Sequence, residues 1–581
     1  LGQHFTSVPN IMKVIEPLFL NDLKEEFENA RGNNNKLNQL LYRLKNIKIF
    51  DPACGSGNFL IIAYKELRRL EMEIFKEMGS LALSEISLNQ FYGIELDDFA
   101  HEIAILALWL TKHQMNVEFF KEFGRTNPTL PLTDSGNIVQ GNACRLDWEE
   151  VCPKGDSDEI YILGNPPYVG FQNQDESQKN DIKAIFKELK NFKRIDYIGC
   201  WLKIATDYIY ETNAAYSFVS TNSICQGEQV GIIWPYILGK RIGLFFAHQS
   251  FNWGNNAKNN AKVTCVIVGL KNESNIKNKY IYTESSKKVV KNISPYLVDT
   301  KTVIPMGRNI TISSINKMSI GNVPLDGNNF ILSKEESDVF LTMYPKYKDF
   351  IKKYMGASDF MRSSPRYCIW ITDKNKNLAL KNKFIADRIE KCRLFRSKGG
   401  IVARNHEKVS YRFRTQPHQE TNSIIFPKTT SSRREYIPAG FLDDSTIISE
   451  KALASYNAEP YLFSVLSSKM HILWLSITSS RMRNDYQYSV KLTYNTFPFP
   501  TISKQRKEEL TQCTLKIIDE RLKHSEKTMA QLYDPDKMPE GLKEAHHQND
   551  LAVERCYRST PFSSDEERLE YLFKLYEKMI Q

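Results

Sequence analysis

The chain has 581 residues, which is long for a single hydrophobic core and predicts two or three domains. Hydrophobic residues make up 41% of it and charged residues 25%, as in water-soluble globular proteins. The sequence has neither an apolar run of the ~20 residues needed to cross a bilayer nor a signal-peptide pattern, which argues against a membrane-spanning or secreted protein.

The positive charge of the chain is concentrated in one segment. The formal net charge is +10, but residues 301–440 contain 15 Lys and 11 Arg against 12 Asp and Glu. This segment therefore carries +14, and the remainder of the chain carries −4. Such a basic region favours binding to the phosphates of a nucleic acid, the alternative being a basic surface that only faces solvent.

The cysteines and histidines indicate reduced thiols and no metal site. Ten cysteines without a CxxC pair argue against a disulfide framework and a zinc finger, and the ten histidines show no HExxH spacing. We therefore expect free thiols and no bound metal. The chain opens on Leu1 rather than Met, which suggests a fragment or a trimmed chain, so both missing upstream domains and a chain without them stay open as alternatives.

The first 60 residues lead from two helical segments into a strand and a glycine-rich turn. A helical periodicity covers residues 11–27, a second helix covers 37–44, and an apolar strand follows at 47–50. The string DPACGSGNFL comes next, at residues 51–60, and opens a further helix. Strand, small-residue turn and helix in this order predict the first unit of a nucleotide-binding α/β sheet.

Polar residues at the ends of the next strands extend this predicted ligand site. Gly55 and Gly57 allow the backbone to approach a ligand closely. A second strand at 91–94 ends at Glu95, whose carboxylate is placed to accept two ribose hydroxyls. A third strand ends shortly before Asn142, whose amide offers a donor and an acceptor suited to an adenine edge.

A stiff polar string follows the predicted fourth strand. This strand covers residues 160–163, ends at Gly164 and is followed by Asn165, Pro166, Pro167 and Tyr168. The prolines fix φ at about −65° and display carbonyls beside the amide of Asn165. Two such acceptors can converge on one amino group, and the ring of Tyr168 can cover the face of a planar base. The alternative is an ordinary strand-to-loop turn.

Three further strands and their helices complete a predicted α/β domain with a Rossmann-like, seven-stranded sheet. Residues 171–180 are typical of a mobile polar loop within it. Later in the chain, basic clusters interleaved with aromatic residues and isolated strands predict a mixed α+β domain suited to nucleic-acid contact. The tail is charged, largely helical and poor in core positions. We therefore expect three parts, residues 1–275, 276–500 and 501–581.

Motif by motif, the chain resembles the amino-methyltransferases that modify DNA bases with S-adenosylmethionine, in the motif order of the gamma class. DPACGSGNF looks like their first cofactor motif, Glu95 like their ribose-binding acid, and NPPY like the catalytic motif of adenine N6 enzymes. Residues 218–224 and 431–438 and the string YNTFPFP look like the methyltransferase and target-recognition part of the MmeI-like type IIG/IIL restriction–modification enzymes. This resemblance covers roughly residues 2–500.

The resemblance implies S-adenosyl-L-methionine as the cofactor and double-stranded DNA as the substrate. It implies methyl transfer to adenine N6, as the modification part of a restriction–modification or phage-defence system, in a bacterial cytoplasm where bound DNA keeps the protein at the nucleoid. The residues expected to bind the cofactor are Phe5, Thr6, Pro9, Asp51, Ala53, Cys54, Gly55, Gly57, Asn58, Phe59, Glu95, Asn142, Ala143 and Asn165.

Catalysis is expected from Asn165, Pro166, Pro167 and Tyr168. We expect Asn165 Oδ1 and the Pro166 carbonyl to accept the two N–H bonds of the amine of a flipped-out adenine. Tyr168 would stack on one face of that base and Phe251 or Trp253 on the other, with core packing as the alternative there. The arginines expected to bind DNA are Arg362, Arg366, Arg404, Arg412, Arg414, Arg433, Arg434, Arg481 and Arg483.

Two considerations bound this function. MmeI-like enzymes usually carry an N-terminal PD-(D/E)xK nuclease, whereas these residues hold no convincing Asp and ExK triad. We therefore expect no nuclease activity from them, and a nuclease domain or subunit outside the chain is a candidate partner. The alternatives are methylation of RNA or of a protein glutamine, or a DNA-binding specificity subunit without catalysis. The intact Asp51, Glu95 and Asn165 argue against the last of these.

Overall fold

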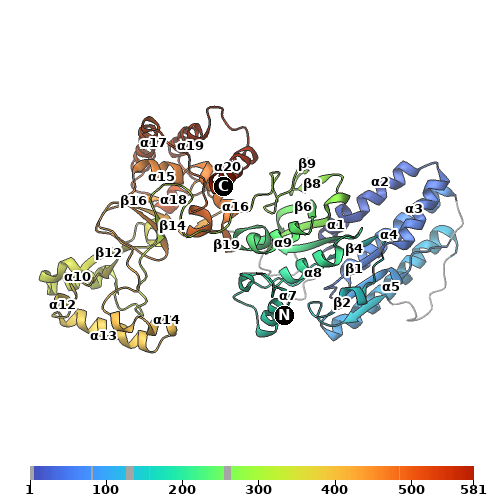
Figure 1. The fold of residues 1–581 in the computed structure, drawn as a ribbon, viewed down its shortest axis with the longest axis horizontal. Coiled ribbons are helices and arrows are strands. Elements are labelled where there is room, and N and C mark those ends of the chain that lie inside the picture. Colours follow the sequence, from blue (N-terminus) through green and yellow to red (C-terminus); the bar gives the residue numbers. More distant parts are fainter. Residues whose placement is uncertain are drawn as a thin grey trace. The chain divides into compact units, whose positions relative to one another are not determined.

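The computed structural model describes residues 6–79, 83–125, 136–155, 158–189, 191–253, 263–482 and 485–581, without the side chains of residues 252, 253, 263 and 482. The chain divides into two compact units, Leu1–Ile304 and Pro305–Gln581 (Figure 1). None of the described helices combines the length and the apolar character that a bilayer crossing requires.

A nine-stranded sheet forms the centre of the first unit, in the order β3-β2-β1-β4-β5-β7-β6-β8-β9. The first five of these strands run parallel, and β7 lies antiparallel between β5 and β6. The seven predicted strands are therefore confirmed, and β8 and β9 extend the sheet beyond residue 275. The strands are β1 (Lys48–Asp51), β2 (Phe91–Glu95), β3 (Asn137–Gln140), β4 (Ile160–Gly164), β5 (Ala215–Thr221), β6 (Ile242–Trp253), β7 (Val263–Asn272), β8 (Lys279–Tyr282) and β9 (Lys287–Val290).

Alternating side chains give the parallel strands two apolar faces. Ile49 of β1 and Tyr161 of β4 point into one buried core, which the first five helices share. On the opposite face Phe50 meets Trp148 edge-on, with 5.3 Å between the ring centroids, and Tyr208 at 6.3 Å. Both faces are covered, which explains why β1 and β4 are continuous apolar runs. The helices are α1 (Val8–Ile15), α2 (Asn21–Ala30), α3 (Asn34–Asn46), α4 (Asn58–Met78), α5 (Asp98–Phe123), α6 (Trp148–Val151), α7 (Glu176–Ile185), α8 (Gly199–Ile209) and α9 (Val230–Gly239).

The order of the strands reverses between β1 and β4. From β1 the chain continues to β2 on one side, and after β3 it returns to β4 on the other side. Such a reversal opens a crevice at the carboxyl ends of the strands, where α/β proteins bind their ligands. Because DPACGSGNFL follows β1 and NPPY follows β4, both motifs lie at this crevice.

The predicted mobile loop over residues 171–180 is wrong in its second half, because α7 begins at Glu176. Asp175 caps this helix by accepting from the backbone N–H of Gln178 at 2.8 Å. Gln178 Oε1 accepts from the backbone N–H of Asp175 in return, at 3.1 Å. This reciprocal capping box satisfies two donors that a helix start otherwise leaves unpaired.

Three small sheets and eleven helices make up the described part of the second unit, which has the mixed α+β fold expected from its sequence. The first sheet joins β10 (Met318–Ile320), β18 (Ala452–Tyr456), β14 (Ser423–Pro427) and β16 (Gly440–Leu442). The second joins β11 (Ile331–Leu332), β13 (Arg366–Ile369), β12 (Ile351–Met355) and β17 (Ile447–Ile448). The third joins β15 (Thr429–Ser431), β20 (Asp485–Gln487) and β19 (Ser480–Met482). The helices are α10 (Lys334–Met343), α11 (Ala357–Met361), α12 (Lys376–Ala379), α13 (Lys383–Ser397), α14 (Ile401–Arg404), α15 (Pro460–Leu466), α16 (Lys469–Thr478), α17 (Lys504–Leu522), α18 (Met529–Leu532), α19 (Glu540–Tyr557) and α20 (Asp565–Ile580).

One arginine is a structural centre of this unit. Arg396 on α13 is fully buried, and its guanidinium donates to five backbone carbonyls. Two of these carbonyls, Leu325 O and Arg412 O, have no other donor among the described residues, and the side chain joins the segment at 324–325 to the segment at 406–412. The acceptors are Leu325 O (2.9 Å), Pro324 O (2.9 Å), His406 O (3.0 Å), Val409 O (3.0 Å) and Arg412 O (2.8 Å).

The C-terminal helices contribute buried apolar side chains to the core of the second unit, in addition to their charged surface. Leu510 and Ile517 of α17 and Leu542 of α19 are fully buried, so the expectation of few core positions is wrong. α17 packs against both α15 and α19, and α16 packs against α20. Two polar contacts reinforce this packing, from Tyr436 Oη to Asp550 Oδ2 at 2.9 Å and from Arg521 Nη1 to Ala439 O at 2.8 Å.

Candidate active site

Asp51 and Gly164 stand side by side at the crevice. β1 and β4 pair in parallel, with Phe50 opposite Ile162, so both strands end at the same edge. Gly164 has a φ of +150°, and a Cβ at this position would lie only 2.5 Å from Asp51 Oδ1. Only glycine fits this backbone and this space. The Asp51 carboxylate is thereby held directly beside the start of the NPPY string.

Asp51 is a buried acceptor with one unused oxygen. Its side chain is 1% exposed, and Oδ1 accepts the backbone N–H of Ala53 at 3.0 Å. Oδ2 has no hydrogen-bond partner among the described residues. Burial, with a smaller contribution from Glu95, raises the pKa of Asp51 to about 8. A buried oxygen without a donor is costly, so this position is suited to a ligand that brings one.

The glycine-rich turn is held by backbone bonds to β2. Cys54 N donates to Ile94 O at 3.0 Å, and Gly55 N donates to Glu95 Oε2 at 2.8 Å. Gly57 has a φ of +82° at the start of α4, and a Cβ there would reach Ala104 at 3.5 Å. Burial raises the pKa of the Cys54 thiol well above its usual range, so this side chain is a neutral packing group.

Glu95 presents a carboxylate at the tip of β2. Besides the bond from Gly55, its Oε1 accepts the backbone N–H of Asp97 at 2.9 Å. Each oxygen therefore has one donor and keeps a lone pair, and the side chain is partly exposed. The unused Asp51 Oδ2, the glycine turn and the Glu95 carboxylate together fit a cofactor with an amino-acid end and a ribose.

Asn142 follows β3 and is tied to α7. Its Oδ1 accepts the backbone N–H of Cys144 at 2.8 Å, and its Nδ2 donates to Asp181 Oδ2 at 3.0 Å. Ala143 is buried, and its carbonyl accepts Trp148 Nε1 at 2.9 Å. Apart from the capping box at Asp175, no feature of the sequence predicts α7. Asp181 lies on this helix and was therefore not among the expected residues.

The NPPY string is stiff and carries a second unused acceptor. Asn165 Oδ1 is buried and has no hydrogen-bond partner among the described residues. The chain is fixed directly after this string, since Val169 N donates to Asp196 Oδ1 at 2.8 Å and Val169 O accepts from Tyr197 N at 3.1 Å. An amide oxygen held in this way, beside the Pro166 carbonyl, can receive an amino group without rearrangement.

The expected stacking residues differ in their surroundings. Tyr168 is partly exposed, and burial and the neighbouring Cys265 thiol raise the pKa of its hydroxyl. Phe251 is 5% exposed and belongs to the core of the sheet, with Lys13 Nζ 4.1 Å from its ring centroid. The side chain of Trp253 lies outside the described residues.

The N-terminal cofactor residues begin the first helix. Thr6 is partly exposed, and the exposed Pro9 occupies the first turn of α1, where its missing N–H costs nothing. α1 packs against β5 and β7. Asn58 and Phe59 begin α4, where Phe59 is 3% exposed and belongs to the core. Phe5 lies outside the described residues.

Comparison with known proteins accounts for the whole chain. Three family models match it: the MmeI DNA-methyltransferase domain over residues 27–283, the MmeI target recognition domain over 299–501 and the MmeI C-terminal domain over 502–581. A DNA methyltransferase A of Bacillus subtilis (strain 168) is 44% identical over 589 residues, which span 100% of this chain and 67% of that protein. The chain belongs to the MmeI family of DNA methyltransferases.

Two further relatives carry the names of restriction or restriction–modification enzymes. The solved structure of the type IIL restriction–modification enzyme MmeI in complex with DNA has a TM-score of 0.88 and 36% identity, covering 99% of this chain and 79% of that one. A putative type II restriction enzyme and methyltransferase of Methanocaldococcus jannaschii is 28% identical over 260 residues, which cover 42% of this chain and 21% of that protein. MmeI-like methyltransferases generally use S-adenosylmethionine.

Among the described residues, the arginines that were expected to bind DNA fall into two groups, those whose side chains make a hydrogen bond or ion pair and those whose side chains do not. Four of the expected DNA contacts already have partners within the second unit. The contacts are Arg366 Nη2 with Asp359 Oδ2 (2.9 Å), Arg412 Nε with Asp373 Oδ1 (3.2 Å), Arg433 Nη2 with Asp536 Oδ2 (2.7 Å) and Arg434 Nε with Tyr533 O (3.1 Å).

The other arginines are less engaged. The side chains of Arg362, Arg404 and Arg414 make no hydrogen bond or ion pair with the described residues, and the first two are exposed. The guanidinium of Arg481 lies 4.7 Å from the ring centroid of Tyr486. Arg483 lies outside the described residues.

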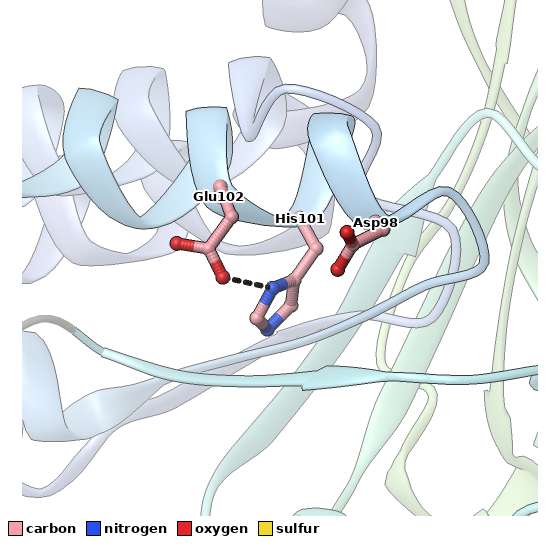
Figure 2. A group of neighbouring side chains, drawn as sticks. All are labelled: Asp98, His101 and Glu102. Carbon is pink, nitrogen blue, oxygen red and sulfur yellow. Dashed lines mark hydrogen bonds and ion pairs between the residues drawn. The ribbon is translucent and has the colours of Figure 1, made fainter.

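One group of potential metal ligands is found among the described residues, at the start of α5. Figure 2 shows His101 beside Glu102 and Asp98. Both ring nitrogens of His101 have protein partners, because Nδ1 lies 3.1 Å from Glu102 Oε1 and Nε2 lies 3.2 Å from Ile138 O. The positive end of a helix dipole also opposes a cation here, so we assign no metal to this group.

Proposed function

We propose that this MmeI-family enzyme transfers a methyl group from S-adenosylmethionine to N6 of adenine in double-stranded DNA. In this proposal residues 1–275 carry the chemistry, 276–500 choose the sequence and 501–581 form a helical C-terminal segment. The enzyme would be the modification part of a restriction–modification or phage-defence system. The proposed activity of these 581 residues is modification without cleavage.

The observation that carries the proposal is the unpaired, buried Asn165 Oδ1 beside Pro166. The lone pair of the adenine amine is delocalised into the ring, so the nitrogen is a poor nucleophile. Asn165 Oδ1 and the Pro166 carbonyl would accept its two N–H bonds, hold the nitrogen in line for transfer and favour the positive charge that develops on it. No covalent nucleophile is needed.

The cofactor residues are assigned by the same reasoning. S-adenosylmethionine supplies a methyl group on a positively charged sulfur when it is bound. Asp51 Oδ2 would accept from its amino-acid end, Glu95 from its ribose hydroxyls, and Asn142 would meet its adenine edge. The turn through Gly55 and Gly57 would let the backbone approach it closely.

Base stacking hides adenine N6 in a duplex, so the target base has to leave the helix at a cost of a few kcal/mol. Tyr168 is proposed to cover one face of the flipped base. Phe251 is proposed to stack on the other face. Because it lies in the core, its ring is less accessible than that of Tyr168. Trp253 is kept as the alternative to Phe251.

The proposal is tested by offering the purified chain tritiated S-adenosylmethionine with duplex DNA, RNA and a protein mixture. We expect label in duplex DNA, recovered as N6-methyladenine after digestion to nucleosides. Label in RNA or protein but not in DNA would refute the substrate assignment, and N4-methylcytosine would refute the base assignment. Single-molecule sequencing of DNA from cells that express the chain would report the modified base together with its recognition sequence.

A further inference from the structure

A buried carboxylate connects the proposed cofactor pocket to α7. Asp181 is 4% exposed and accepts from three side chains. Its Oδ2 accepts from Asn142 Nδ2 at 3.0 Å and from Tyr197 Oη at 2.8 Å, and its Oδ1 accepts from Arg145 Nε at 2.8 Å. With three donors on two oxygens, the orientation of this carboxylate is fixed.

These bonds also determine which way the Asn142 amide points. An amide oxygen and nitrogen look alike in shape, so only their partners distinguish them. Asp181 Oδ2 can only accept and therefore faces the Asn142 NH₂ group. The backbone N–H of Cys144 can only donate and therefore faces Asn142 Oδ1, at 2.8 Å. Asn142 is partly exposed, so its oxygen still has a lone pair to offer to a ligand.

We propose that Asp181 is a positioning residue for the adenine of the cofactor. By holding the Asn142 NH₂ group, it makes Asn142 present an acceptor to the ligand, so that the pocket selects a purine with an amino group over one with a carbonyl. The inference rests on the proposed function, because it takes Asn142 as the reader of the adenine edge. Asp181 itself does not touch the cofactor.

The arrangement predicts an unusual response to a single substitution. In Asp181→Asn, the charged Arg145 donor takes the new amide oxygen, since its bond is the stronger one. The new NH₂ group then faces the Asn142 NH₂ group, and we expect the Asn142 amide to turn to relieve this contact, giving up its bond from Cys144 N and offering its NH₂ group to the ligand. Removing Arg145 as well frees the new oxygen to turn back towards Asn142, and the original preference returns. Arg145 is 57% exposed, so the fold tolerates its loss.

The experiment measures binding of S-adenosylhomocysteine and S-inosylhomocysteine to the full chain by isothermal titration calorimetry. The two ligands differ only at one edge of the purine, where inosine has a carbonyl at C6 and a proton on N1 in place of the amino group and the unprotonated N1 of adenosine. We expect the parent to prefer the adenine ligand by about tenfold to a hundredfold, as when one buried polar group is left unpaired. Asp181→Asn should lower this ratio at least tenfold, and Asp181→Asn with Arg145→Ala should restore most of it. Tyr197→Phe, which removes a different donor from the same carboxylate, should keep the parental ratio.

Each other outcome decides against the inference. An unchanged ratio in Asp181→Asn, or an equal loss of both affinities that Arg145→Ala does not reverse, would make Asp181 a scaffold residue only. If the parent binds both ligands equally, Asn142 reads no edge and the inference fails while the proposed function stands. If the parent binds neither, the proposed function fails with it. Should Asp181→Asn not fold, Asp181→Ala provides the test, with a smaller fall of about threefold because Cys144 alone then orients the amide.

Discussion

Two sites, one in each unit, use buried polar side chains in opposite ways. At the crevice of the first unit, Asp51 Oδ2 and Asn165 Oδ1 are buried and lack partners among the described residues. In the second unit, the buried guanidinium of Arg396 donates to five carbonyls. An acceptor without a donor can accept a hydrogen bond from a ligand, whereas a donor group whose hydrogen bonds are all made within the protein contributes to folding. At these two sites, the missing partners mark the candidate active site, and the complete set of partners marks a folding centre.

The largest expected effect comes from removing the unfilled acceptor next to the reacting group. Asn165→Ala should lower the rate constant of methyl transfer by about a hundredfold to a thousandfold, because it removes one of the two acceptors proposed for the adenine amine. Binding of S-adenosylhomocysteine and of DNA should stay within a few fold of the parent. Single-turnover methylation and equilibrium binding measure the two quantities separately. Full activity in this variant would refute the mechanism.

Replacing Arg396, whose guanidinium is saturated with acceptors, should instead lower the stability of the second unit. Arg396→Ala removes five hydrogen bonds, leaves Leu325 O and Arg412 O without a donor among the described residues, and should reduce the free energy of unfolding of the second unit by about 3 kcal/mol or more. The matched control is Arg393→Ala on the same helix, whose partners Glu390 and Glu407 are partly or fully exposed, so that the loss should stay below about 1 kcal/mol. Denaturant unfolding compares them, and equal losses would contradict the assignment.

The cost of burying the Asp51 carboxyl can be measured as a dependence of the free energy of unfolding on pH. Its pKa is raised from 3.8 to about 8, so the folded protein keeps the proton up to pH 8 while the unfolded chain loses it above about pH 4. Between these values the unfolded state binds fewer protons, and this group makes the parent less stable by about 1.4 kcal/mol per pH unit as pH rises. Asp51→Asn should therefore gain stability relative to the parent from pH 5 to pH 8 and level off above. Parallel stability curves would show that Asp51 does not titrate in this range.

The smallest effect separates free from engaged arginines among the expected DNA contacts. Arg362 has no side-chain partner among the described residues, whereas Arg366 is paired with Asp359. Arg362→Ala should weaken DNA binding by roughly fivefold and lower the slope of log affinity against log salt by about 1. Arg366→Ala should change both less, because Asp359 competes with phosphate for the guanidinium. A reversed order, measured by fluorescence anisotropy over a salt series, would mean that Arg366 exchanges its partner for DNA.

Local patterns account for what could be predicted from the sequence. Asp51 and Glu95 end short apolar strands and Asn165 directly follows one, so parallel pairing alone brings them to one edge. Asp181 was missed because it meets Asn142 from a helix 39 residues further along the chain. The burial of Phe251 under Lys13 depends on a contact between segments far apart in sequence, as does the burial of Ile517 in the tail. Such contacts leave no mark on the pattern of the segments themselves.

The joint between the recognition segment and the C-terminal helices also limits how specificity can be re-engineered. Arg433 pairs with Asp536, Arg434 donates to Tyr533 O and Tyr436 donates to Asp550. A cassette cut at residue 500 and exchanged between relatives would separate each donor from its acceptor. Grafts that carry residues 501–581 along with the recognition segment keep these bonds, so the unit of exchange is the pair of segments.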